Sequence, residues 1–98
     1  MANQPTSGGQ YVFVSAAGTT VVTNRDANLY NVLIPGTYIG SVEFYDSATA
    51  AGTAAGNKIY QVGLPGLNQN QSISINARTR NGLTYVATGT PTVGFTWD

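Results

Sequence analysis

Two acidic side chains, Glu43 and Asp46, form the closest pair of carboxylates along this chain. Paired carboxylates can hydrolyse glycosidic bonds when they face each other across about 5 to 9.5 Å. On an extended strand, however, residues three positions apart point to opposite faces and lie roughly 10 Å apart. We therefore do not expect Glu43 and Asp46 to share an acid–base cleft.

No second catalytic set is present, because the 98-residue chain contains neither histidine nor cysteine. Without histidine the chain lacks the usual general base near neutral pH and the commonest metal ligand. Without cysteine it lacks thiolate nucleophiles, Cys-based metal sites and disulfides. We expect the protein not to be an enzyme and to hold no cofactor.

Two pairs of oxygen donors could contribute to a calcium site, namely Asp26 with Asn28 and Asp46 with Ser47. Calcium takes about six to eight oxygen ligands, and the spacing of an EF-hand loop is missing. Aspartate and asparagine at turns commonly accept hydrogen bonds from nearby backbone N–H groups. We interpret Asp26, Asn28 and Asp46 in this way and expect no metal site.

Charge is scarce throughout the chain. Only 8% of the residues are charged, against roughly 25% in ordinary soluble domains, and the net charge is zero. Such a surface offers no field to attract nucleic acid or an anionic membrane. We expect neither partner and no small-molecule substrate. Low charge favours protein–protein association, although a neutral solvated surface has the same composition.

The segments that must position these residues are short and rich in Val, Ile, Thr and aromatic residues, with Gly, Pro and Asn between them. This pattern is typical of antiparallel β-proteins. It predicts an all-β fold, an antiparallel β-sandwich or jelly roll of about 7–8 short strands. The expected strands are 10–15, 19–24, 29–34, 37–46, 57–64, 72–78, 83–88 and 92–97.

Alternation along the expected strands predicts which side chains form the core, since successive side chains point to opposite faces of a sheet. The clearest case is the segment 72–78, in which apolar residues alternate with Ser, Asn and Arg. The predicted core residues are Val42, Phe44, Ile73, Ile75, Ala77, Leu83, Tyr85, Ala87, Val93, Phe95 and Trp97.

Turn residues predict how neighbouring strands are joined. We expect a hairpin between 10–15 and 19–24, and a second hairpin with a type I′ turn at Asn81–Gly82. Pro35–Gly36 suits a type II turn, and 63–71 forms a long turn. The segment 47–56, SATAAGTAAG, is expected to be a loop, with a short helical turn as the alternative.

The first nine residues, MANQPTSGG, contain no large apolar side chain apart from the initial Met. We expect residues 1–9 to form a flexible arm and residues 10–98 to form a single β-sandwich domain. The amino-terminal segment also lacks the basic start and apolar run of a secretory signal. We therefore expect synthesis in the cytoplasm of a host cell, without a signal peptide.

Two segments, VEFYDSATAAGTAAGNKIYQVG and SISINARTRNGLTYVATGTPTVGFTW, resemble small β-sandwich proteins of tailed bacteriophages. The shared features are a YD strand end, a Ser/Thr/Ala/Gly loop, a K-I strand and an NGL-Y-V hairpin, which together cover about residues 38–97. The resemblance implies a capsid decoration (cement) protein or another virion accessory, located on the capsid surface. It also implies binding to the major capsid protein, commonly as homotrimers.

Candidate interface residues follow from this hypothesis. They are Gln4, Pro5 and Thr6 in the arm, Ala50, Ala51, Gly52 and Thr53 in the loop, and Arg78 and Arg80. Small neutral residues permit close approach of another surface without desolvation of charge. The two arginines are expected either to support a turn or to contact a neighbouring subunit, because Arg is favoured at interfaces.

Tyrosines suggest an alternative function from another class. Aromatic rings presented on a sheet can stack on sugars. A glycan-binding module of a phage tail or fibre would use Tyr30, Tyr38, Tyr45 or Tyr60 as its stacking platforms.

Overall fold

The computed structural model describes residues 10–34, 39–63 and 71–98. Within these residues the chain forms strands and two short 3₁₀ turns, and no α-helix. The strands are β1 (Gln10–Val14), β2 (Gly18–Thr23), β3 (Ala27–Ile34), β4 (Ile39–Tyr45), β5 (Lys58–Val62), β6 (Gln71–Thr79), β7 (Leu83–Thr90) and β8 (Val93–Trp97); the turns are η1 (Ala50–Gly52) and η2 (Ala55–Asn57).

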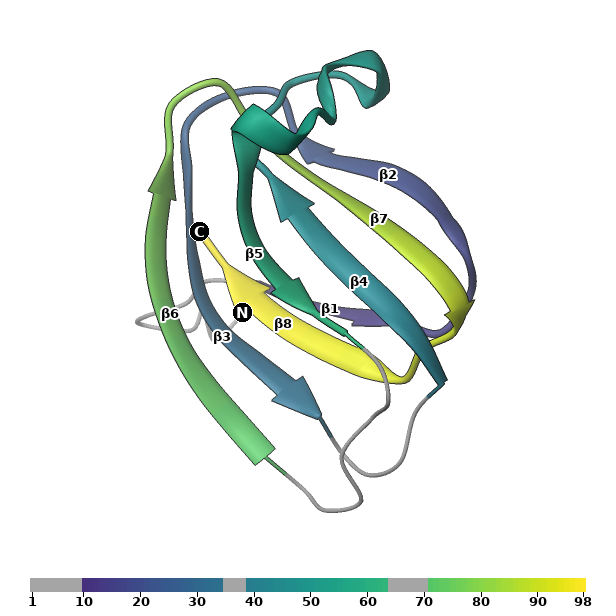
Figure 1. Cartoon of the computed structure of the whole chain (residues 1–98). Coiled ribbons are helices and arrows are strands. Elements are labelled where there is room, and N and C mark those ends of the chain that lie inside the picture. The colour runs from purple at the N-terminus through teal and green to yellow at the C-terminus, as the bar shows by residue number, and fades with distance from the viewer. Residues whose placement is uncertain (1–9, 35–38, 64–70) are drawn as a thin grey trace.

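The strands form two antiparallel four-stranded sheets that pack face to face (Figure 1). Sheet A has the order β1-β8-β3-β6, and sheet B has the order β2-β7-β4-β5. The pairs β4–β5, β3–β6, β2–β7 and β1–β8 are nested, so the chain is one long hairpin rolled into two layers. This is the jelly-roll arrangement, and the predicted all-β sandwich is confirmed.

The core lies between the two sheets and is built from the residues that alternation selected. Val42, Phe44, Leu83, Val93 and Phe95 are fully buried. The rings of Phe44 and Phe95 meet edge to face with their centroids 5.0 Å apart, and Tyr85 packs edge to face on Phe95 at 5.7 Å. Such edge-to-face pairs add stability beyond their buried area.

The remaining predicted core positions also face the interior. Ala87 is buried and Ala77 is half-buried. The other side chains are half-buried and pack against the core; these are Ile73, Ile75, Tyr85 and Trp97. Strand boundaries differ from the prediction by a few residues. For example, β3 begins at Ala27, and β7 continues to Thr90 through a segment expected to turn.

Both predicted hairpins are wrong. β1 pairs with β8 and β2 pairs with β7, so the first two strands lie in different sheets. β6 and β7 are likewise separated, because β6 pairs with β3 in sheet A. Asn81 does not have the positive φ that a type I′ turn requires; among the described non-glycine residues only Asn76 does, at 53°. Residues 80–82 therefore cross between the layers.

Several expectations fall on residues that the structure does not describe. These are the flexible arm 1–9, the Pro35–Gly36 turn and most of the long turn at 63–71. The segment 47–56 was expected to be a loop, with a short helical turn as the alternative. The structure has short helical turns there, namely η1 and the start of η2.

Candidate protein interface

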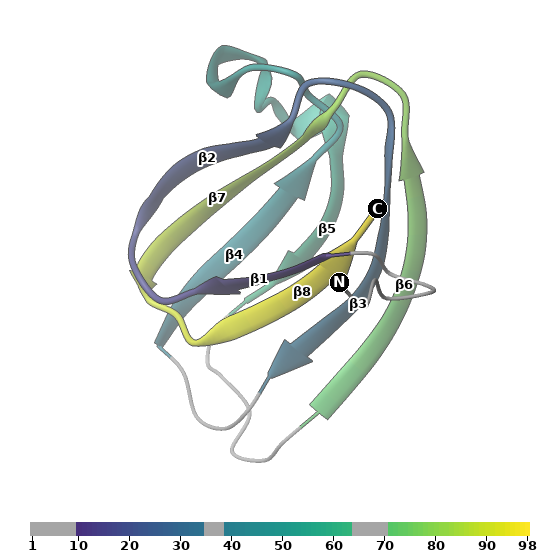
Figure 2. The same cartoon turned by 180° about the vertical axis from the view of Figure 1, so that it is seen from behind.

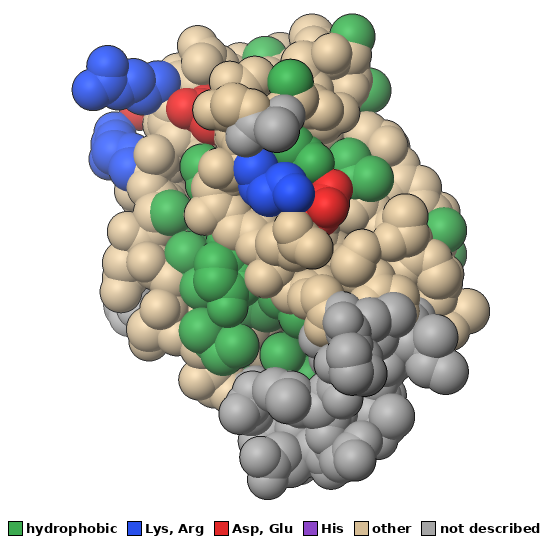
Figure 3. Space-filling view, in the orientation of Figure 1, with side chains coloured by type: hydrophobic (Ala, Val, Ile, Leu, Met, Phe, Trp, Pro, Cys, Tyr) green, Lys and Arg blue, Asp and Glu red, His purple; other side chains and the backbone are tan. Residues whose placement is uncertain are grey.

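The candidate interface residues that the structure describes lie at one end of the sandwich, which we call the charged end. It consists of the connections between β2 and β3 (24–26), between β4 and β5 (46–57), and between β6 and β7 (80–82). These three connections lie side by side at the top of Figures 1 and 2. In the space-filling view, basic and acidic side chains gather at one corner of this end (Figure 3).

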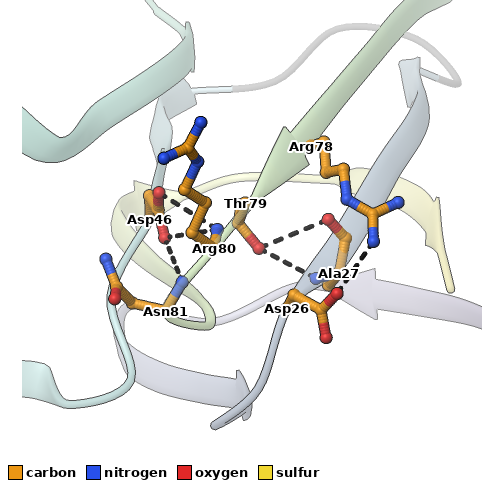
Figure 4. A network of polar contacts seen from close by, with 7 residues as sticks. All are labelled: Asp26, Ala27, Asp46, Arg78, Thr79, Arg80 and Asn81. Atoms are coloured by element: carbon orange, nitrogen blue, oxygen red, sulfur yellow. Dashed lines mark hydrogen bonds and ion pairs between the residues drawn. The ribbon is translucent and has the colours of Figure 1, made fainter.

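Asp46 joins two of these connections. Its Oδ1 accepts hydrogen bonds from the backbone N–H of Asn81 at 2.8 Å and of Arg80 at 3.1 Å, and its Oδ2 lies 3.2 Å from the same Arg80 nitrogen (Figure 4). The carboxylate thus satisfies the backbone donors at the crossing from sheet A to sheet B. The interpretation of Asp46 as a turn acceptor is confirmed.

The start of β3 is fixed to the end of β6 by two different contacts (Figure 4). Inside, the buried Thr79 hydroxyl accepts from the Ala27 N–H at 3.1 Å and donates to the Ala27 carbonyl at 3.3 Å. Outside, the Arg78 guanidinium pairs with the Asp26 carboxylate at 2.8 Å, with side chains 66% and 55% exposed. An ion pair this exposed contributes little to stability. The interpretation of Asp26 as an acceptor of backbone hydrogen bonds is therefore replaced by an ion pair.

The β4–β5 loop is folded onto the sandwich by neutral groups. Ser47 is buried; its hydroxyl donates to the Thr49 carbonyl at 2.6 Å, and its own carbonyl accepts from the buried Thr84 hydroxyl at 2.8 Å. Thr49 caps η1 by accepting from the Gly52 N–H at 3.2 Å. The Asn57 amide donates to the Gly52 carbonyl at 2.8 Å. Hydrogen bonds within the loop and from Thr84 of β7 thus hold the loop in place.

The structure brings the two described groups of predicted interface residues to the same end. Ala50 and Ala51 are exposed, whereas Gly52 and Thr53 are half-buried. Gly52 has no room for a side chain because a Cβ there would overlap the Ser47 hydroxyl. The smallness of this residue therefore serves the internal packing of the loop. Gln4, Pro5 and Thr6 lie outside the described residues.

The two arginines differ in their roles. Arg78 is engaged by Asp26, while Arg80 contributes its backbone N–H to Asp46. Among the described residues, the exposed Arg80 guanidinium has no hydrogen-bond or ion-pair partner. Arg80 thus takes part in the turn through its backbone N–H, which any residue except proline could supply, and a contact of either arginine with a neighbouring subunit stays a prediction.

The outer face of sheet B carries one polar cluster. The Tyr45 hydroxyl donates to Glu43 Oε1 at 2.6 Å, and Lys58 Nζ lies 3.3 Å from Glu43 Oε2 and 2.9 Å from the Gln61 amide oxygen. The hydrogen bond from Tyr45, followed by that from Lys58 and its charge, lowers the pKa of Glu43 against the opposing effect of burial. The same bond, with burial and the Glu43 charge, raises the pKa of Tyr45 to about 12.

The described tyrosines that were proposed as sugar-stacking platforms are buried or half-buried. Tyr45 is only 6% exposed, so its ring cannot receive a sugar, and this part of the prediction is wrong. Thr84, directly opposite Tyr45 on β7, is bonded to the β4–β5 loop, which folds over this corner. Tyr30 and Tyr60 are half-buried, and Tyr38 lies outside the described residues.

The aromatic residues that are exposed in the described part of the chain are not among those predicted to be functional from the sequence. Tyr11 and Phe13 of β1 are 56% and 49% exposed on the outer face of sheet A. The sequence pattern that could have identified them is the segment QYVFVS, in which apolar side chains occupy both faces of one strand. Val12 and Val14 supply the inner face, so the other two side chains must point outward.

The pairs of oxygen donors considered for calcium are used otherwise. The Asp26 carboxylate binds Arg78, and both oxygens of Asp46 face backbone N–H groups. In the described part of the chain, no group of three or more His, Cys, Asp or Glu side chains lies close enough to hold a metal ion.

Comparisons with models of protein families, with curated proteins and with solved structures find no match for this chain. None of the helical turns in the described residues has the length and apolar character needed to cross a membrane. The resemblance to phage proteins therefore stays a prediction that rests on the two segments quoted above.

Proposed function

We propose that this protein is a non-enzymatic structural protein of a virus particle, a decoration protein that binds the major capsid protein on the outer surface of a phage head. It acts by covering neighbouring surfaces and stabilises the shell without performing a reaction. Many copies on a symmetric lattice make individually weak contacts effective.

The observation that carries this proposal is the segregation of charge. All eight charged residues, four basic and four acidic, lie in described parts of the chain. Six lie at or beside the charged end: Arg25, Asp26, Asp46, Arg78, Arg80 and Asp98. The other two, Glu43 and Lys58, neutralise each other on sheet B.

The rest of the surface is therefore built from neutral side chains. The described connections 15–17 and 91–92 contain no charged residue, and the sequence of the segments 35–38 and 64–70 contains none either. A partner that covers such a surface does not have to desolvate charges, and copies side by side do not repel one another. Depletion of charge is also characteristic of the centres of protein interfaces.

The fold is compatible with this role, since jelly rolls occur in viral capsid proteins as well as in lectins. Fold alone does not establish function. The resemblance of residues 38–97 to phage β-sandwich proteins favours the capsid, and it implies trimers over local threefold positions. Both remain parts of the proposal.

The test is a count of copies in purified virions produced from the genome that encodes this chain. Quantitative mass spectrometry against the major capsid protein should find a copy number of the same order as that protein. A handful of copies would assign the chain to a tail or fibre, and its absence from the particle would refute a virion role.

A glycan array on the isolated protein separates the two function classes. We expect no saturable sugar binding, because Tyr45 is buried and Tyr30 and Tyr60 are half-buried. Binding that is lost on Tyr30→Ala or Tyr60→Ala would instead favour the glycan-binding module.

A further inference from the structure

Among the described residues, each sheet ends in two strands whose outer backbone groups lack a strand partner. These edge strands are β1 and β6 in sheet A, and β2 and β5 in sheet B. An unpaired edge can bind a strand of another chain, and proteins commonly prevent this with charged residues, prolines or bulges. In this molecule three of the four edge strands have such a feature, and one does not.

Three of the edges are interrupted. The pairing of β2 with β7 shifts register between Val21 and Thr23. β6 contains Asn76 at a φ of 53°, within a register shift against β3. β5 begins with Lys58, where its register with β4 also shifts. A bulge or a charge at these places disturbs the flat row of donors and acceptors that an added strand needs.

β1 has none of these devices. Its register with β8 runs without a shift from Gln10 opposite Trp97 to Val14 opposite Val93. The strand QYVFV contains no charge and no proline, and the first charged residue of the chain is Arg25. Figure 2 shows β1 at the border of sheet A beside β8.

Among the described residues, the exposed aromatic side chains lie on this unprotected strand. Tyr11 and Phe13 point outward from sheet A and are the most exposed large apolar residues among those described. A Cβ built on Gly94 would overlap the Tyr11 ring, so this ring leans over β8. β8 lies on the paired side of β1, and the ring therefore leaves the free edge open.

We propose that a second copy of this chain binds along the free edge of β1, with the two β1 strands antiparallel and related by a twofold axis at Val12. This register places Tyr11 opposite Phe13 of the second copy, and Phe13 opposite its Tyr11. Directly opposite side chains on a sheet face lie about 4.5 to 5.5 Å apart at Cβ, which allows aromatic contact once the Tyr11 ring turns from β8 towards the axis. The two copies of sheet A then form one continuous sheet.

The occupant is a second copy because the strand is complementary to itself. A twofold axis at the middle residue of a five-residue strand pairs every residue of β1, and both aromatic residues fall in aromatic pairs. No charge of one β1 meets a charge of the other, so the contact has no electrostatic penalty. The twofold contact is separate from the threefold association implied by the phage resemblance, and the two can coexist.

The test is the molar mass in solution, measured by light scattering after size-exclusion chromatography. In the double variant Tyr11→Lys with Phe13→Lys, two lysines would face two lysines across the axis. We expect this variant to have half the mass of the wild-type protein. The expected change is from dimer to monomer, or from hexamer to trimer if a threefold contact also forms.

A second variant tests the register. Tyr11→Lys with Phe13→Glu places lysine opposite glutamate in the proposed pairing and should restore the wild-type mass. A twofold axis at Phe13 would instead oppose glutamate to glutamate and leave this variant dissociated. The matched control is Thr19→Lys with Val21→Lys, which adds the same charges at exposed positions two residues apart on the β2 edge and should leave the mass unchanged.

Circular dichroism establishes that each variant is folded before its mass is compared. A wild-type protein that is monomeric at all concentrations would overturn the proposal, as would an unchanged mass in the folded double-lysine variant. A control variant that also dissociates would place the contact elsewhere. None of these results depends on whether the protein belongs to a virion.

Discussion

The hydrogen bond between Tyr45 and Glu43 makes stability depend on pH in two separate ranges. The pKa of Glu43 is lowered, so its contribution is present above the ordinary value of 4.5 and is lost as the pH falls through the folded-state pKa. The pKa of Tyr45 is raised from 10.0 to about 12, so its contribution is lost as the pH rises between these values.

Replacing Tyr45 with Phe should weaken the pH dependence of stability in both ranges. The variant leaves Glu43 Oε1 without the tyrosine donor, and we expect a loss of about 2 kcal/mol in the free energy of unfolding at neutral pH. Urea unfolding at several pH values measures this loss. In a spectrophotometric titration of the folded protein, the tyrosinate component near pH 12 should disappear. Persistence of that component would assign the high pKa to a different tyrosine.

Individual residues were predictable from sequence to different degrees. Asp46 was recognised as a turn acceptor because aspartate at turns commonly accepts hydrogen bonds from nearby backbone N–H groups. The burial of Tyr45 was not recognised, because alternation places its side chain on the outer face of the sheet together with Glu43. The β4–β5 loop next to it is bonded to Thr84, directly opposite Tyr45, and no local pattern encodes where a loop of small residues will lie.

Gly82 shows how tightly the elements of the charged end are packed. A Cβ at this position would lie 2.7 Å from both the Ser47 and the Thr23 carbonyl oxygens, and 2.8 Å from the Ala48 Cα. All three atoms belong to backbone that strands on either side hold in place. Gly82→Ala should therefore force the β6–β7 connection apart, at a cost of about 1 to 3 kcal/mol.

Gly56→Ala is the matched control, because no atom lies within 4 Å of a Cβ placed there. An alanine that fits restricts the unfolded chain, so this variant should be unchanged or more stable by up to about 1 kcal/mol. Urea unfolding of both variants gives the comparison. Equal stabilities would mean that the crossing can move without cost and that the charged end is not tightly packed.

The strands were largely predictable, whereas their pairing was not. Alternation of Val42 and Phe44 with polar residues identifies a strand with one buried face, whichever neighbour it pairs with. The Asn81–Gly82 pair favours a hairpin locally, but Asp46 binds the backbone of residues 80 and 81 in a different conformation. The nested order of a jelly roll depends on contacts between distant strands, and these leave no signal in a short segment.

At the scale of the whole molecule, composition predicted a surface with few charges but not where on the surface those charges lie. The scarcity of charge was evident from the sequence, and it led to the hypothesis of an interface. That six of the charged residues converge at one end follows from the topology, which brings together turns distant in sequence. The exposed aromatic edge of β1 emerged only once its pairing with β8 was known.

The absence of charge from β1 predicts how association between copies responds to salt. Contacts between charged surfaces weaken as the screening length falls from about 30 Å at 0.01 M salt to about 3 Å at 1 M. The β1 contact contains no charge, so its dissociation constant should change less than about threefold over that range. Sulfate, which strengthens apolar burial, should tighten it. Sedimentation velocity at several salt concentrations measures the constant, and a steep weakening with sodium chloride would assign the contact to the charged end.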